Sequence, residues 1–169
     1  QRDVVAYLRN GNVLVHVEEE EQLRIFDALK QQTIQILDEP MEWQQAIHKA
    51  SEPLLHRAII KKSYVQAMID LLYDYGPYIV LANGVAIAHA NPEQGANALG
   101  LSLLINKQSI TFEDDANVHF LFVLSNPDQD KHLHLLRDIM RLANDTALVD
   151  QLLKMDDTLA VLEGLKKLS

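Results

Sequence analysis

The seven histidines stand out as the side chains of this sequence that could carry chemistry. An imidazole changes its charge near neutral pH, and its free nitrogen can act as a nucleophile, a base or a metal ligand. Cysteine is absent, which excludes disulfides and thiolate chemistry. The chain also has no G-x-S-x-G nucleophile motif and no glycine-rich phosphate loop. The histidines are therefore the first candidates for any covalent chemistry in this chain.

Four of the histidines need no function. His48 and His56 lie off the apolar stripe of their expected helix, so we expect both to be exposed. His16 falls in an expected N-terminal hairpin and has no evident partner. His119 lies in an apolar, strand-like run, where we expect it to make one structural hydrogen bond.

His89 is placed differently, because it ends the β-prone run 85–89 and a turn-rich stretch follows at 90–95. The ends of strands, next to loops, are where α/β folds commonly place ligand chemistry. A histidine at a strand end can also be only a polar residue at the sheet edge. The pattern alone does not choose between these two interpretations.

His132 and His134 lie in the same expected helix but on different sides of it. At about 100° per residue, His132 borders the buried face near Leu136 and Ile139, whereas His134 points away from it. The first turns of a helix carry unpaired N–H groups that favour anions. His132 is therefore a candidate N–H donor to an oxyanion, and a histidine that caps a loop carbonyl at the core edge is the structural alternative.

A metal site is not expected. His132-x-His134 places its two imidazoles on opposite sides of a helix, and no HExxH motif is present. We accordingly expect neither a metal nor another cofactor.

Apolar spacing and turn residues predict the elements that would position these side chains. Asn10-Gly11 between β-prone runs predicts a hairpin, Ser63 with Gln66 predicts a helix capping box, and Asn126-Pro127 predicts a helix start. The predicted strands cover 33–37, 78–82, 85–89, 99–106 and 118–125, and the predicted helices cover about 41–58, 63–75, 128–143, 146–154 and 157–167. This order predicts an α/β fold, a mixed β-sheet flanked by helices on both faces.

The 169 residues suffice for one domain of ordinary size. We expect residues 1–22 to form an N-terminal hairpin or appendage, and residues 23–169 to form the functional domain. The first residue is Gln rather than Met, so we expect a longer parent protein or processing.

The formal net charge of −9 argues against binding to a nucleic-acid backbone, which requires clusters of cations. No apolar stretch approaches the roughly 20 residues that a membrane span needs. Together with the lack of cysteine, these features favour a cytoplasmic protein without membrane insertion.

Two blocks of sequence resemble a known family. Residues 76–95, GPYIVLANGVAIAHANPEQG, are similar to the active-site strand of the enzyme IIA domains of the mannitol/fructose phosphotransferase family, especially its ascorbate-like branch. Residues 126–133, NPDQDKHL, resemble a second family block with a histidine near a helix start. The resemblance extends from about residue 23 to the C-terminus.

The resemblance implies a phosphoryl relay in sugar uptake, of the ascorbate, pentitol or mannitol type. The histidine matching His89 would accept a phosphoryl group from the histidine phosphocarrier protein and pass it to an enzyme IIB partner. The histidine matching His132 would lie beside it and hydrogen-bond the phosphoryl group. The sugar and the oligomeric state, including a homodimer, stay open.

The sequence departs from the family at some positions. Ala88 and Asn83 stand where the family commonly has proline, and Leu71-Leu72 occupy a stretch where some members carry arginine. These changes suit a regulatory copy. Besides a transport enzyme IIA, we therefore consider a IIA-like regulatory domain of a transcriptional regulator or antiterminator, which the Gln start and residues 1–22 favour. A non-catalytic binding domain with a structural His89 is the third interpretation.

Overall fold

The computed structural model describes residues 3–9, 12–19, 23–113, 116–128 and 133–168, the first two ranges by their backbone alone. Strands β1 (Asp3–Arg9) and β2 (Asn12–Glu19) pair antiparallel as a two-stranded sheet of their own. This confirms the predicted pair of strands, while the turn between them lies outside the described residues. The division of the chain after residue 22 stays a prediction.

The second sheet carries the rest of the architecture. Its strands are β3 (Leu29–Leu37), β4 (Met41–Glu42), β5 (Val85–Ala88), β6 (Gly100–Thr111) and β7 (Asn117–Ser125). They follow the order β3-β6-β7-β5, with β4 beside β6. The pairs β3–β6 and β5–β7 are parallel, whereas β6–β7 is antiparallel, so the predicted mixed sheet is confirmed.

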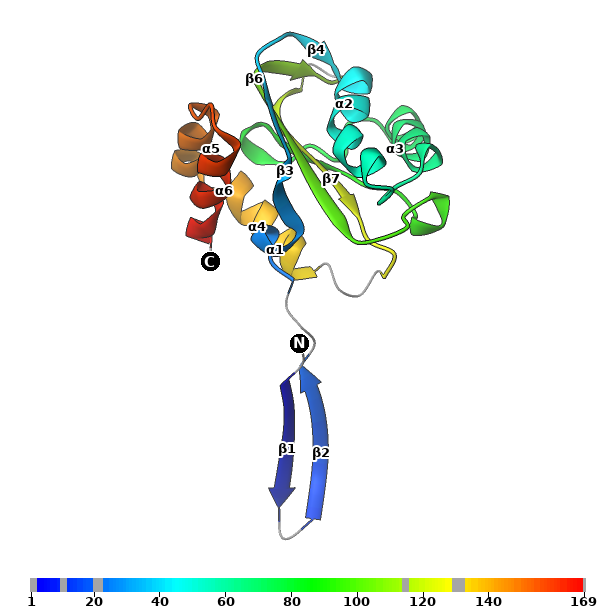
Figure 1. Ribbon diagram of the computed structural model, residues 1–169, viewed down its shortest axis with the longest axis vertical. Coiled ribbons are helices and arrows are strands. Elements are labelled where there is room, and N and C mark those ends of the chain that lie inside the picture. The colour runs from blue at the N-terminus through cyan, green and yellow to red at the C-terminus, as the bar shows by residue number, and fades with distance from the viewer. Residues whose placement is uncertain (1–2, 10–11, 20–22, 114–115, 129–132, 169) are drawn as a thin grey trace.

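Helices cover both faces of this sheet, as predicted (Figure 1). They are α1 (Ile25–Ala28), α2 (Trp43–His56), α3 (Lys62–Tyr75), α4 (Leu133–Ala143), α5 (Thr146–Leu153) and α6 (Thr158–Leu165). Short 3₁₀ turns occupy Ala82–Gly84, Pro92–Gln94 and Lys166–Leu168. Helices α2 and α3 pack on one face, and α1, α4, α5 and α6 pack on the other. Among the described residues, no helix has the length and apolarity to cross a bilayer.

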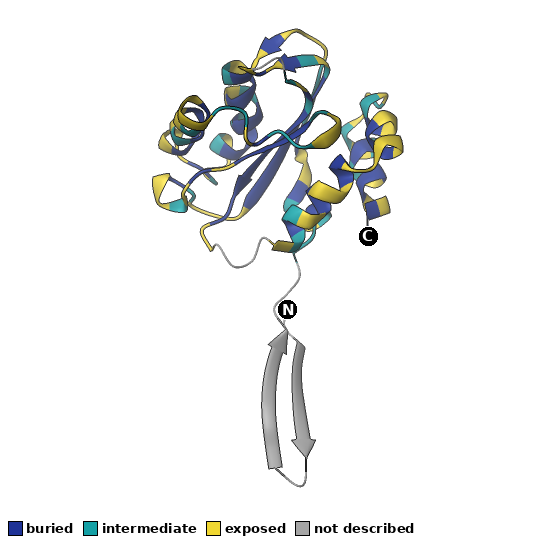
Figure 2. Ribbon diagram, turned by 180° about the vertical axis from the view of Figure 1, so that it is seen from behind, coloured by how far each residue is buried: buried dark blue, intermediate teal, exposed yellow. Residues whose placement is uncertain are grey.

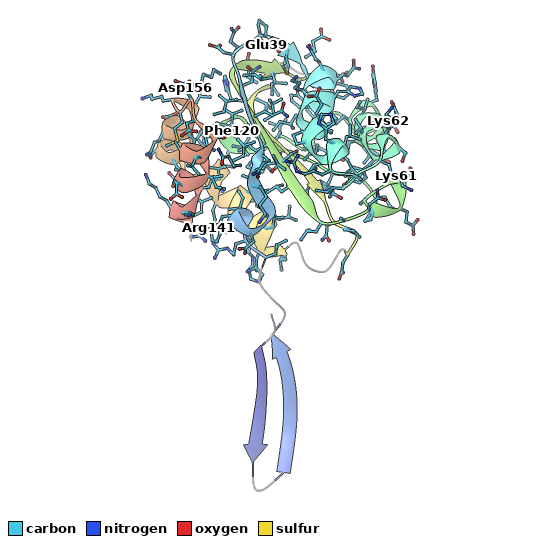
Figure 3. The ribbon with its side chains drawn as sticks, in the orientation of Figure 1. Glu39, Lys61, Lys62, Phe120, Arg141 and Asp156 are labelled. Carbon is cyan, nitrogen blue, oxygen red and sulfur yellow. The ribbon has the colours of Figure 1, made fainter. Side chains whose placement is uncertain are left out.

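The central strands are buried on both sides because each face has its own apolar core (Figure 2). Since side chains alternate along a strand, β5 divides its residues between the two cores. Val85 and Ile87 belong to the core under α4–α6, whereas Ala86 and Ala88 belong to the core under α2 and α3. Figure 3 shows Phe120 of β7 inside the domain, in contrast to the exposed Lys61 and Lys62 at the start of α3.

The predicted helix over 63–75 is confirmed, but its capping box is wrong. The helix begins one residue earlier, with Lys61 as its N-cap. The Ser63 hydroxyl instead donates a hydrogen bond to the carbonyl oxygen of Gln94 at 2.6 Å, and the Gln66 amide donates to Asp70. Ser63 therefore bonds a residue that is distant in the sequence, and Gln66 bonds a residue one turn further along the helix.

The segment 78–82 is not a strand, in contrast to the prediction. It makes a single bridge between Val80 and Ala86, after which residues 82–84 turn back into β5. The Leu81 N–H donates to Val85 O at 2.7 Å, and the Ile87 N–H donates to Ile79 O at 3.2 Å. The segment thus covers the outer edge of β5 without continuing the sheet.

Two further boundaries differ from the prediction. Strand β3 begins at Leu29 rather than at residue 33, directly after the short helix α1, which ends at Ala28. Asp128 is not helical, and the described part of α4 begins at Leu133. The predicted helix start at 126–129 is therefore wrong for Asn126 to Asp128, and Gln129 lies outside the described residues.

An ion pair ties the start of the domain to α4 and to the C-terminal turn. The Arg24 Nε and Nη2 atoms each donate to a carboxylate oxygen of Asp138 at 2.8 Å, and Nη2 also donates to Leu168 O. The same carboxylate accepts the Ile25 backbone N–H at 3.0 Å. The Asp138 side chain is only 2% exposed, so its charge depends on these donors for the solvation that water would give.

We expect Arg24→Met to lower the free energy of unfolding by about 3 kcal/mol, because it leaves a buried carboxylate without its cation. Lys49→Met removes an exposed ion pair with Glu52 and should cost less than about 1 kcal/mol. Urea denaturation of both variants provides the measurement. Equal losses in the two variants would contradict the role assigned to Asp138.

Candidate functional site

His89 is an exposed residue directly after a fully buried strand. All of β5 from Val85 to Ala88 is buried, His89 is exposed, and Ala90 is buried again. Strand β5 runs parallel to β7 with Ala88 opposite Val123, so both strands end at the same edge of the sheet. An exposed imidazole is therefore held at the end of two rigid strands.

Strand periodicity indicates the face of the sheet to which His89 belongs. Residues two apart along a strand share a face, so His89 follows Val85 and Ile87, which pack under α4–α6. Ala90 packs in the other core, with α2 and α3, as the same alternation requires. His89 thus belongs to the face that α4 covers.

The ends of β5 and β7 are joined through the hydroxyl of Tyr64, a residue of α3 that is 1% exposed. Its Oη accepts the Ala90 N–H at 3.0 Å and donates to Leu124 O at 2.7 Å. One oxygen therefore satisfies a donor that lies two residues after β5 and an acceptor of β7.

Burial raises the pKa of Tyr64 above its usual value, and the hydrogen bond with Ala90 opposes this only in part. The phenol accordingly stays protonated at neutral pH. It must be protonated there, because a phenolate could not donate to Leu124 O.

The loop that follows His89 is fastened to the start of α3. The Asn91 side chain accepts the Glu93 N–H at 3.0 Å and so begins the turn Pro92–Gln94. The Lys61 N–H donates to the carbonyl of Gly95 at 2.9 Å. Gly95 has φ 134°, and a Cβ there would lie 2.9 Å from the Ser63 hydroxyl. Only glycine fits this contact, which holds the loop close to α3.

The segment after β7 leaves the sheet at the same edge. Ser125 Oγ donates to Ala98 O at 2.7 Å, and the Asn126 side chain accepts the Asp128 N–H at 3.0 Å. His132 itself lies outside the described residues, immediately before the described start of α4 at Leu133. The structure therefore does not test whether His132 meets His89.

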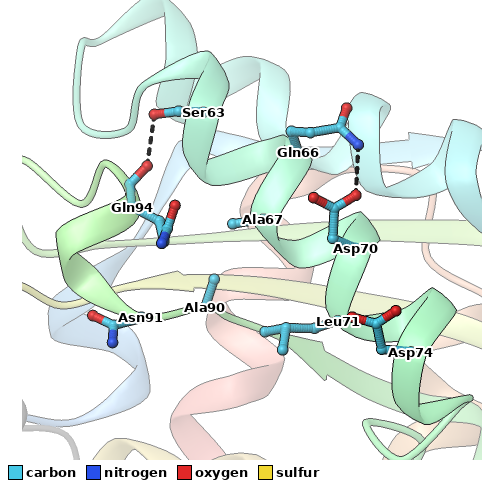
Figure 4. A pocket seen from close by; sticks show the side chains of 9 residues that line it. All are labelled: Ser63, Gln66, Ala67, Asp70, Leu71, Asp74, Ala90, Asn91 and Gln94. Carbon is cyan, nitrogen blue, oxygen red and sulfur yellow. Dashed lines mark hydrogen bonds between the residues drawn. The ribbon is translucent and has the colours of Figure 1, made fainter.

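A groove lies beside the loop, on the α3 side (Figure 4). Its volume is about 450 Å³. It is lined by one stripe of α3 and by the chain after His89, namely Ser63, Gln66, Ala67, Asp70, Leu71, Asp74, Ala90, Asn91 and Gln94. His89 is not among the lining residues, in agreement with its place on the other face.

His48, His56 and His119 agree with their expected positions, whereas His134 was expected to point away from the buried face of its helix and does so only in part. His48 and His56 are exposed. His119 is half-buried, and its Nδ1 lies 2.9 Å from Asn106 O. His134 is half-buried, and the side chain of His16 lies outside the described part. In the described ranges, no three metal-ligating side chains converge.

Asn83 connects the turn before β5 to the end of α4. Its Nδ2 donates to Ala143 O at 2.7 Å and to Thr146 Oγ1 at 3.2 Å. Its backbone is left-handed, with φ 55°. Proline, whose ring holds φ near −65°, could not adopt this conformation. This turn therefore depends on asparagine, which tolerates the left-handed region and caps the helix.

Sequence reasoning missed Tyr64, Asn83 and the pair Arg24–Asp138. Tyr64 lies four residues before Met68 on the buried stripe of α3, so its burial could have been predicted. Its contacts could not, because both of its partners are backbone groups of distant strands. Asp138 is 1% exposed, although a charged residue in a helix is normally exposed, so its burial could not be expected without knowledge of its partner Arg24.

Comparison with protein families gives one match that covers most of the chain. Residues 27–168 match the model of the family described as phosphoenolpyruvate-dependent sugar phosphotransferase system, EIIA 2.

Individual relatives agree with this match. The mannitol-specific cryptic phosphotransferase enzyme IIA component of Escherichia coli is 33% identical over 132 residues, which cover 78% of this chain and 90% of the relative. An ascorbate-specific EIIA component of Salmonella choleraesuis is 30% identical, over 77% of this chain and 87% of its own. The solution structure of the cryptic E. coli enzyme IIA superimposes with a TM-score of 0.76 at 30% identity, over 86% and 99% of the two chains.

We expect Asn83→Gly to cost about 1 kcal/mol of unfolding free energy, because it removes the hydrogen bonds but keeps the left-handed turn. Asn83→Ala should cost about 1 kcal/mol more, since alanine disfavours that conformation. Urea denaturation of the two variants separates the effects. Equal stability of the glycine and alanine variants would show that the turn relaxes.

Proposed function

This chain belongs to the EIIA 2 family of the phosphoenolpyruvate-dependent sugar phosphotransferase system, and on that premise we propose that His89 is its phosphoryl acceptor and donor. The chain is a sugar-specific EIIA component of the mannitol and ascorbate type. In the proposed relay, His89 takes the group from the histidine phosphocarrier protein and gives it to an enzyme IIB partner.

The observation that carries the proposal is the placement of His89. It is an exposed imidazole held between two buried residues at the common end of two parallel strands. A weak nucleophile becomes competent when its approach to the donor is fixed and a partner protein can reach it. Exposure supplies the access, and the buried neighbours supply the fixed backbone.

The step exchanges one P–N bond for another. A ring nitrogen of neutral His89 attacks the phosphorus of the donor's phosphohistidine in line with the bond that breaks. The lone pair of His89 forms the new P–N bond, and the electron pair of the old bond stays on the donor imidazole. No oxidant or metal is needed for this balance. The charge on the transferred group's oxygens requires N–H donors in the transition state.

His132 is the proposed side-chain donor to those oxygens. Strand β7 ends beside β5, and the chain reaches position 132 seven residues after Ser125. Strand periodicity assigns His89 to the face that α4 covers, and His132 directly precedes the described part of α4. Both facts favour a meeting of the two imidazoles at this edge, with His132 neutral and donating.

The exposure of His89 favours phosphoryl transfer over a purely structural role. A purely structural histidine needs no access to solvent, and His119 beside Asn106 O is only partly exposed, whereas a phosphoryl acceptor must be reachable by its protein partners.

We expect incubation with phosphoenolpyruvate, enzyme I and the histidine phosphocarrier to add one acid-labile phosphate to this chain. Phosphate should be lost in His89→Ala and kept in His56→Ala, which removes an exposed histidine of α2. Radiolabelled phosphate on the intact protein provides the measurement. Unchanged labelling of His89→Ala would exclude the proposed acceptor, and failure to pass label to any enzyme IIB would exclude a transport role.

We expect His132→Ala to slow phosphoryl transfer to His89 roughly 100-fold, the usual effect of removing one donor to a transition-state oxyanion. His134→Ala, a change on the same stretch of chain but on the other side of the predicted helix, should leave the rate within about twofold. Rapid-quench kinetics measure both rates. Equal rates for the two variants would refute the role of His132.

A further inference from the structure

The hydrogen bonds of β5 show which of its N–H groups face β7. Val85 O and Ile87 N bond outward, to Leu81 N and Ile79 O. Because successive residues of a strand point their N–H groups to opposite edges, those of Ala86, Ala88 and Ala90 face β7. The parallel register sets Ala88 opposite Val123.

If the parallel hydrogen-bond pattern between β5 and β7 continued past Ala88, the Ala90 N–H would bond directly to Leu124 O. In the structure, the Tyr64 hydroxyl occupies that place, 3.0 Å from Ala90 N and 2.7 Å from Leu124 O. Both backbone groups remain satisfied, but through an inserted oxygen. The strands are therefore held apart at the residue pair that follows His89.

This insertion bears directly on His89. The Ala90 nitrogen belongs to the peptide bond that joins it to His89, so holding that N–H fixes the ψ angle of His89. Leu124, whose carbonyl takes the other side of the bridge, lies opposite His89 in the register that pairs Ala88 with Val123. One buried hydroxyl thus sets both the direction of the His89 backbone and its distance from β7.

We infer that Tyr64 is a positioning residue for phosphoryl transfer: its hydroxyl, inserted between β5 and β7, holds His89 in the orientation that in-line attack requires. The inference rests on the proposed function of His89. Tyr64 does not touch the phosphoryl group or a partner protein, because its side chain lies on the buried side of α3. It acts through the backbone of its neighbours.

Tyr64→Phe is the decisive variant, because it removes the oxygen and keeps the ring. The Ala90 N–H and Leu124 O then either pair directly or lose their partner, and His89 shifts in both cases. We expect kcat for phosphorylation by the histidine phosphocarrier to fall about 10- to 100-fold, as displacements near 1 Å do. KM for the phosphocarrier should change less than about twofold, since the surface stays the same.

Two controls separate positioning from stability. Thr33→Val removes another buried hydroxyl, which accepts Lys30 N and donates to Lys30 O on strand β3, far from β5 in the strand order. Tyr73→Phe makes the same chemical change on the same helix, at an exposed hydroxyl bonded to Gln44. Both controls should keep the wild-type kcat, even where Thr33→Val lowers the urea midpoint as much as Tyr64→Phe does.

An NMR measurement on the unphosphorylated protein tests the geometry without any donor. Tyr64→Phe should shift the ring resonances of His89 and change the exchange protection of the Ala90 amide, and the controls should change neither. Unmoved His89 resonances, or moved resonances with a wild-type kcat, would overturn the inference. If the wild type accepts no phosphoryl group, the proposed function fails, and the NMR result still decides whether Tyr64 sets the position of His89.

Discussion

The parallel pairing of β5 and β7 is the constraint on which the site depends. Parallel strands end at one edge, so the chain after each strand begins at the same place. The chain after β5 begins with His89, and the chain after β7 continues toward His132 and α4. Helices on both faces bury all of β5 and the β7 residues that pair with it, and that burial holds the two strand ends in place. The Tyr64 hydroxyl then sets how far apart the two strand ends lie.

Much of the fold could be predicted from the sequence because its signals are local. The apolar stripes of α2 and α3 and the β-prone runs of β6 and β7 correspond to elements of the structure. Errors arose where a local signal competed with a distant partner. Ser63 has the sequence of an N-cap, yet its hydroxyl is used by Gln94. The run 78–82 is β-prone, but the left-handed Asn83 turns it back before it can pair along its length.

The candidate site was only partly predictable. The position of His89 at the end of a strand follows from the turn-rich sequence after it. The contact of Tyr64 next to it does not, because the Tyr64 hydroxyl bonds backbone atoms of two distant segments. The ion pair of Arg24 with Asp138, which fastens the start of the domain, likewise joins residues more than a hundred positions apart. Hydrogen bonds of this kind leave no periodic trace in a sequence. The family resemblance supplied the role that we propose for His89, which spacing alone left open.

The segment that covers β5 also limits how other proteins can engage this domain. Ile79 and Leu81 satisfy the outward backbone groups of Ile87 and Val85. A partner protein therefore cannot add a strand to the sheet along that part of β5, because the backbone N–H and C=O groups there are already hydrogen-bonded. A partner protein that binds beside this part of β5 must therefore use side-chain contacts rather than strand pairing. Side-chain contacts of this kind are compatible with the proposed relay, in which the domain releases one partner protein before it binds the next.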